Sequence, residues 1–133
     1  MSARKLTELA VEVQDQTGEL ARVLGLAAQA GANVIAFCGY AHGTSPGAEI
    51  LIVPDTSDRA LAALQKAGYT VTSAPVVAIS GAAGRGMGAR LAEKLSKAGI
   101  NILYSYASSS GAGQSTAIFR VLKPDLALRA LKS

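Results

Sequence analysis

The sequence predicts an α+β protein that contains two copies of one βαββαβ module. The first observation is an internal repeat, in which Ala30-Gly31-Ala32-Asn33-Val34 returns as Ala98-Gly99-Ile100-Asn101-Ile102, 68 residues later. The second is the order of hydrophobic patterns, which is the same in both halves of the chain. The third is the length of the repeat, because solenoid repeats have about 20–50 residues and a longer unit is the size of a small domain.

Each element of the first half follows from its pattern of apolar residues. Residues 9–13 alternate between apolar and other side chains, which predicts a half-buried strand. Residues 20–30 carry apolar side chains at steps of three and four, which predicts a helix that Gly31 ends. The rest of the module is a hairpin of strands at 34–40 and 49–53, a helix at 58–67 that Gly68 ends, and a strand at 69–73.

The second half repeats this order but lacks the last strand. It gives a strand at 76–80, a helix at 88–98, strands at 102–108 and 115–122, and a helix at 125–131. In a ferredoxin-like antiparallel sheet of order 4-1-3-2, with its helices on one face, the strand at 76–80 then lacks one neighbour. Because an unpaired strand edge favours aggregation, we expect another segment or another chain to lie alongside it. The predicted domains are residues 1–75 and 76–133.

Composition and charge limit the possible classes. Each half is small enough to be marginally stable alone, so we expect the halves to pack together or the chain to form a homodimer. Residues 1–75 have five Lys and Arg against seven Asp and Glu, whereas residues 76–133 have eight against two, which favours association of unlike halves. No apolar run could span a membrane and the start lacks a signal peptide, so we predict a cytoplasmic protein.

The residues from Val11 to Leu24, followed by Ala30 to Val34, resemble the signature of ACT domains. That family's pattern is a strand, an acidic or amide residue two or three positions before a glycine, an amphipathic helix, and a Gly-x-Asn-Ile/Val step into the next strand. The resemblance covers essentially the whole chain as a tandem pair. It implies a stand-alone regulatory protein that binds a free amino acid where paired ACT domains meet, with Asp15 and Asn33 facing the ligand.

The chemistry of these residues agrees with that implication. The start of a helix at Gly18 offers unpaired backbone N–H groups to a carboxylate. Asp15 can accept from an ammonium group, and Asn33 can both donate and accept. An alternative is that Asp15 and Thr17 only cap the helix and that Asn33 is a turn residue. The predicted ligand-binding residues of the first repeat are Asp15, Gln16, Thr17, Gly18, Glu19, Leu20, Asn33 and Val34.

The second repeat departs from the pattern, because Ala83 stands where the first repeat has Asp15. Its loop either holds an anion through Arg85 and backbone N–H groups or has a purely structural role, the interpretation that we prefer from sequence. The predicted ligand-binding residues of this repeat are Arg85, Gly86, Met87 and Asn101.

Other functions have weaker support in the sequence. Gly84, Gly86 and Ala89 fit a dinucleotide fingerprint, but the acidic residue expected about 20 positions later is missing. The stripe of Arg90, Lys94 and Lys97 would suit RNA. RNA-recognition modules, however, stack bases on aromatic residues of their central strands, and here the strand at 76–80 has none and the other central strand has only Phe119. Cys38 and His42 are too few for a metal site, and the chain shows no catalytic set of residues.

We therefore predict a non-enzymatic amino-acid sensor that needs no cofactor or metal and binds neither nucleic acid nor membrane. The alternative is a ligand-free ACT-type module that serves oligomerisation or contacts a regulated partner, such as an enzyme or a transporter.

Overall fold

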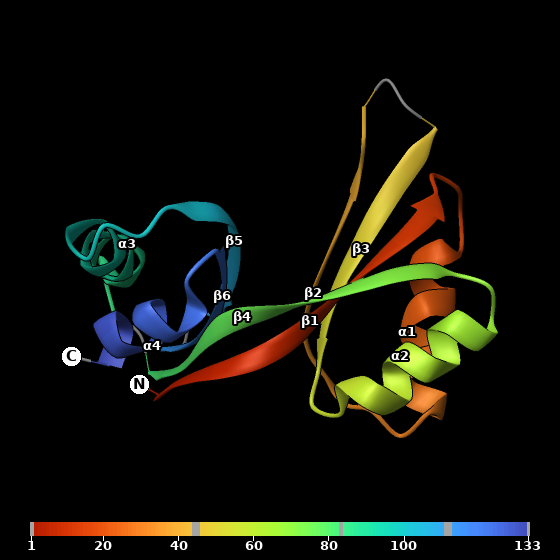
Figure 1. Cartoon of the computed structure of the whole chain (residues 1–133), viewed down its shortest axis with the longest axis horizontal. Helices are drawn as coiled ribbons and strands as arrows, with labels where there is room; N and C mark the ends of the chain where they lie inside the picture. The colour runs from red at the N-terminus through yellow and green to blue at the C-terminus, as the bar shows by residue number, and fades with distance from the viewer. Residues whose placement is uncertain (1, 44–45, 83, 111–112, 133) are drawn as a thin grey trace. The chain divides into compact units, whose positions relative to one another are not determined.

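The computed structural model of the chain describes residues 2–43, 46–82, 84–110 and 113–132. Figure 1 shows its helices and strands. In chain order they are β1 (Ser2–Gln14), α1 (Glu19–Gln29), β2 (Val34–Ala41), β3 (Gly47–Pro54), α2 (Ser57–Lys66), β4 (Thr70–Ala82), α3 (Met87–Lys97), β5 (Ile102–Ser109), β6 (Gln114–Val121) and α4 (Pro124–Lys132). All predicted elements are present, and the predicted α+β fold with antiparallel strands is confirmed.

β1 and β4 extend furthest beyond the strands that the sequence predicts. β1 begins at Ser2 rather than near Leu9, and β4 joins the two strands predicted at 69–73 and 76–80 into one strand of 13 residues. The strand order is β2-β3-β1-β4-β6-β5. The polar segment before Leu9 lacks a clear strand pattern, and the two strands predicted at 69–73 and 76–80 are separated by Ala74 and Pro75, of which the proline cannot donate a backbone hydrogen bond in a sheet.

The chain divides into two compact units. One consists of Thr7–Ala74, and the other of Met1–Leu6 together with Pro75–Ser133. The boundary at Ala74 and Pro75 lies at the predicted domain boundary, but the first six residues belong to the unit formed by the second half. β1 and β4 each contribute residues to both units.

The start of β1 supplies the neighbour that the second repeat lacks. β4 lies between β1 and β6 in the strand order, and the segment up to Leu6 shares a unit with the second half of β4. Ala3 packs against the core of that unit, and Lys5 Nζ lies 2.8 Å from Asp125 Oδ1 of α4. The prediction that another segment covers this strand is therefore confirmed, and the missing strand no longer argues for a homodimer.

Each unit has its own hydrophobic core on the helix-covered side of its strands. In the Thr7–Ala74 unit, Leu9, Val11 and Ile52 pack with residues of α1 and α2, such as Val23 and Leu64. The core of the other unit has the same plan and includes Val77, Ile79, Leu91, Leu95, Phe119 and Leu131. Burial of these side chains stabilises each unit by roughly 25 cal/mol for each Å² of apolar surface removed from water.

The two hairpins show where the repeats differ in length. Both have a register shift at matching positions, between Val34 and Ala36 in β2 and between Ile102 and Tyr104 in β5. β2 and β3 are joined by residues 42–46, whereas β5 and β6 are joined by residues 110–113. The single residue lost in the second repeat therefore lies in this connection, so matched residues are 68 apart before it and 67 apart after it.

Candidate functional site

Both repeats begin their first helix at a glycine. The φ angles of Gly18 before α1 and Gly86 before α3 are +94° and +79°, which L-residues with a side chain rarely adopt. Within the described residues, neither helix start has a side-chain capping hydrogen bond. The alternative in which Asp15 and Thr17 cap α1 is therefore wrong for this structure. Each helix start keeps backbone N–H groups that could bind an anion.

The structure separates the two parts of the site predicted in the first repeat. Asp15, Gln16, Thr17 and Gly18 precede α1, and Glu19 and Leu20 form its first turn, whereas Asn33 and Val34 follow its other end. Because α1 has 11 residues and an α-helix rises about 1.5 Å per residue, these groups are about 16 Å apart along the helix. One amino acid cannot bridge them within this unit.

Asn33 has a structural role in the turn between α1 and β2. Its backbone N–H donates to Asp55 Oδ1 at 2.8 Å, and the Asp55 N–H donates to the Asn33 carbonyl at 2.9 Å. The bond from Asn33 and a further one from the Thr56 hydroxyl lower the pKa of the Asp55 carboxyl. The ionised form of Asp55 therefore holds this turn together.

Glu19 also has a partner within its own unit. Tyr69 Oη lies 3.4 Å from both carboxylate oxygens of Glu19, and the guanidinium carbon of Arg22 lies 5.1 Å from the centre of the Tyr69 ring. Burial and the nearby Glu19 carboxylate raise the pKa of Tyr69. A cavity of about 440 Å³ borders Tyr69 and His42, and the residues predicted from the sequence are not among its described lining.

A cavity of about 560 Å³ lies at the start of α3 in the second repeat. Its lining includes the predicted residues Arg85, Gly86 and Met87, and Leu91 lies one turn further along the helix. The facing strands contribute small side chains. They are Ala107, Ser108 and Ser109 of β5 and Ser115 and Ala117 of β6. The structure thus brings together the glycine loop, an arginine and several hydroxyl groups, within the size range of small-molecule sites.

This cavity exists because a small residue replaces a large one. Ala117 matches Ile50 of the first repeat, and Ile50 is buried in the core of its unit. Since protein interiors are close-packed, an alanine in place of this isoleucine leaves space next to the helix start.

Two arginines adjoin this loop. Arg85 lines the cavity, and its carbonyl oxygen accepts a hydrogen bond from Nη1 of Arg90 at 3.0 Å. Arg90 also lies against the turn, since a Cβ atom added at Gly86 would stand 3.3 Å from Arg90 Nη1. Asn101 lies beyond the opposite end of α3, as Asn33 does for α1, and is not among the described residues that line the cavity.

The contribution of the β5–β6 hairpin to this cavity was not predicted from the sequence. Ser109 and Ser115 are direct partners across these strands, and so are Ala107 and Ala117. Ser109 and Ser110 were interpreted as part of the turn between the strands predicted at 102–108 and 115–122. The signal in the sequence was the comparison of the repeats, since Ser109 and Ser115 match Ala41 and Ala48. Hydroxyl groups here replace methyl groups there.

In the part of the chain that the structure describes, His, Cys, Asp and Glu side chains do not form a group of three or more that could hold a metal ion. Among the same residues, every helix is too short or too polar to cross a membrane.

Known structures share this fold. A protein of Bacteroides thetaiotaomicron is 24% identical, with a TM-score of 0.82 over 98% of this chain and 88% of that chain. The regulatory subunit of aspartate kinase from Thermus thermophilus, in a ligand-free form, is 20% identical, with a TM-score of 0.71 over 99% of this chain and 95% of that chain. The corresponding subunit from Thermus flavus is 20% identical, with a TM-score of 0.61 over 99% and 95%.

A comparison with curated protein sequences gives no match. The sequence model described as an ACT domain pair matches residues 4–131, which is nearly the whole chain and includes both glycine loops. The chain therefore belongs to the ACT domain pair family.

Proposed function

We propose that this ACT domain pair is a non-catalytic regulatory module that binds a free amino acid at the start of α3. The observation that carries the proposal is the cavity of about 560 Å³ where Arg85 and the Gly86 turn face the β5–β6 hairpin. In the described residues the first turn of α3 has no side-chain cap, so its backbone N–H groups can bind a carboxylate. The charge of Arg85 supports the same orientation of the ligand.

The rest of the cavity suits the other parts of an amino acid. The hydroxyl groups of Ser109 and Ser115 can accept from an ammonium group, while Leu91 and Ala117 offer an apolar surface to a side chain. None of the described lining residues is acidic, so the site carries positive charge. We therefore expect a neutral or acidic amino acid to bind more tightly than a basic one.

If a ligand binds where paired ACT domains meet, as the family resemblance implies, the edge strands of this chain could form such a pair. β2 and β5 stand at the two ends of the strand order. Phe37 and Tyr40 on β2 are 51% and 47% exposed, and Leu103 on β5 is 45% exposed. Exposed apolar residues on edge strands favour pairing with another chain. This supports the second candidate function, a module that forms homodimers or contacts a regulated partner.

Thermal denaturation with each of the 20 amino acids tests the main proposal. A ligand at about 100 times its dissociation constant adds about 2.7 kcal/mol to the free energy of unfolding, which raises the melting temperature by several degrees. Arg85→Ala should abolish this increase. Arg129→Ala, which removes an equal charge from α4, should keep it.

The variant Asp15→Ala tests which of the two repeats binds the amino acid. If the response survives Asp15→Ala and disappears in Arg85→Ala, the ligand binds in the second repeat. The reverse result would place it in the first repeat and contradict the proposed site. If none of the 20 amino acids raises the melting temperature, amino-acid binding is refuted, and the oligomeric state of Phe37→Asp measured by sedimentation then tests the second candidate.

A further inference from the structure

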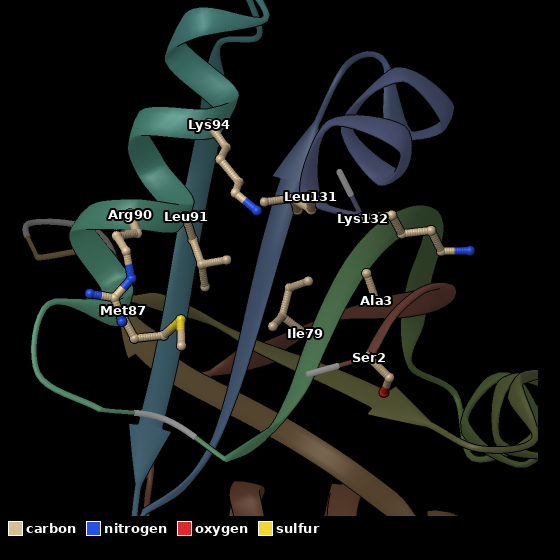
Figure 2. A pocket seen from close by; sticks show the side chains of 9 residues that line it. All are labelled: Ser2, Ala3, Ile79, Met87, Arg90, Leu91, Lys94, Leu131 and Lys132. Carbon is tan, nitrogen blue, oxygen red and sulfur yellow. The ribbon is translucent and has the colours of Figure 1, made fainter.

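A second cavity, of about 600 Å³, lies in the same unit between α3, α4 and the sheet. Its floor is apolar and includes Ile79 of β4, Leu91 of α3 and Leu131 of α4. In Figure 2, Leu91 extends from α3 toward Ile79, and Leu131 approaches from α4. Ala3 of β1 completes this side of the cavity. The cavity adjoins the proposed amino-acid site and shares Met87 and Leu91 with it, but that site faces the β5–β6 hairpin.

We call this second cavity the inner cavity, and its rim is cationic. Arg90 and Lys94 of α3 and Lys132 of α4 line it, and none of the described lining residues is acidic. Figure 2 shows the amine of Lys94 extending across the opening toward Leu131, whereas the amine of Lys132 points away. The ammonium group of a lysine above an apolar surface can pair with the anionic group of a ligand, while that surface contacts the apolar part of the ligand.

The first repeat shows that this space is not required by the fold. Lys94 matches Leu26, which packs against the core of the Thr7–Ala74 unit. In the second repeat, the strand beside the second half of β4 is the start of β1, which carries Ala3. In the first repeat, the corresponding strand is the first half of β4, which packs Val71 against the core. In the second repeat, a cation and a methyl group thus replace two larger apolar side chains.

We propose that the inner cavity binds a small amphiphilic anion, with its carboxylate or phosphate group at Lys94 and its aliphatic body on Ile79, Leu91 and Leu131. Burial of the aliphatic body removes apolar surface from water, and the anionic group meets positive charge where the opening reaches solvent. The volume is within the range of about 300–1,000 Å³ that is usual for small-molecule sites. This site does not depend on the proposed amino-acid site.

The test is an NMR titration of the full chain with three probes, hexanoate, hexyl phosphate and hexan-1-ol. Either anion should shift the methyl signals of Ile79, Leu91 and Leu131, and the tighter of the two identifies the preferred head group. Hexan-1-ol should bind about tenfold more weakly, because it lacks the charge that Lys94 meets. The proposal fails if neither anion shifts these methyl signals, or if hexan-1-ol binds as tightly as the anions.

Lys94→Leu installs the residue that the first repeat has at the matching position, and it should weaken anion binding by about tenfold or more. The matched control is Lys97→Leu, because Lys97 lies on the exposed side of α3 beside Glu93 at 3.2 Å. Equal binding by these two variants would overturn the proposal. Ala3→Val, which narrows the cavity without changing its charge, gives a second test if Lys94→Leu does not fold.

The amino-acid response of these variants, measured by thermal denaturation, keeps the two sites distinct. Lys94→Leu should keep that response while losing the anion, whereas Arg85→Ala should lose the amino-acid response and keep the anion.

Discussion

Asn33 and Asp55 form a reciprocal pair, in which each backbone N–H donates to an oxygen atom of the other residue, at 2.8 and 2.9 Å. Asn33 stands just before β2 and Asp55 just after β3, so this pair joins two turns at one end of the Thr7–Ala74 unit. The asparagine of the family signature is therefore used here for its backbone, and its partner is a carboxylate.

Removing the charge of Asp55 should destabilise the Thr7–Ala74 unit. The pKa of Asp55 is lowered from its ordinary value near 3.8, chiefly by the hydrogen bond from Asn33. The stabilisation is therefore present above that ordinary value and is lost as the pH falls below it and through the lowered pKa. Asp55→Asn should melt a few degrees below the wild type at pH 7, and this difference should shrink as the pH falls below the ordinary value. Equal melting temperatures at pH 7 would contradict this role.

The second repeat offers the converse experiment. Leu122 directly follows β6 as Asp55 follows β3, and its side chain is 72% exposed. Leu122→Asp should therefore create a matching bond to the backbone N–H of Asn101 and raise the melting temperature, with the gain lost at low pH. A lower melting temperature at pH 7 would show that the turn of the second repeat has a different geometry.

The two helix-starting glycines allow a matched comparison. Alanine in this left-handed conformation costs roughly 1–2 kcal/mol, so both Gly18→Ala and Gly86→Ala should lower stability in urea denaturation. At Gly18 the new methyl group meets open space, whereas at Gly86 it meets Nη1 of Arg90. Gly86→Ala should therefore cost more and also remove the amino-acid response, which Gly18→Ala should keep. The same loss of response in both variants would place ligand at both loops.

The start of β1 can be tested by deletion. A chain that begins at Thr7 lacks the strand beside the second half of β4. Hydrogen exchange should then accelerate in residues 76–82, while β2 and β3 keep their protection. Lys5→Ala is the control, because its ion pair with Asp125 is exposed to solvent and such pairs contribute little. Unchanged exchange in residues 76–82 would show that this strand does not need its neighbour.

The order of elements was predictable because both repeats keep their periodic apolar residues. Equivalent core positions are occupied by Val11 and Ile79, and likewise by Val23 and Leu91. Because the apolar pattern occurs twice, each helix or strand is predicted from two segments of the chain. The extension of β1 to Ser2 was not predictable in the same way. Its residues are placed by pairing with a strand about 70 positions away, and a local pattern does not contain that information.

The candidate site was only partly predictable. Arg85, Gly86 and Met87 do line a cavity, because the glycine that starts α3 is a local feature that the sequence shows directly. The preference for the first repeat rested on Asp15, an acidic residue. Whether a loop opens onto space depends instead on the volume of residues far along the chain, such as Ala117 in place of Ile50. The two repeats reveal such a difference in side-chain volume only when it is known which strands pair and therefore which residues face the loop.

The two proposed sites of the second repeat share a wall, and this predicts that their ligands affect each other. Met87 and Leu91 line both cavities, and Arg90 lines the inner cavity while it donates to the carbonyl oxygen of Arg85. A ligand that moves Arg90 or Met87 changes the shape of the other site.

The affinity for the amino acid identified by thermal denaturation should change about fivefold or more when hexanoate is saturating. Isothermal titration calorimetry should find the same factor for hexanoate in the presence of the amino acid, because coupling between two binding equilibria is reciprocal. Arg90→Ala should reduce the factor toward one. Independent affinities in the wild type, or coupling that survives Arg90→Ala at full strength, would show that the first turn of α3 does not connect the two cavities.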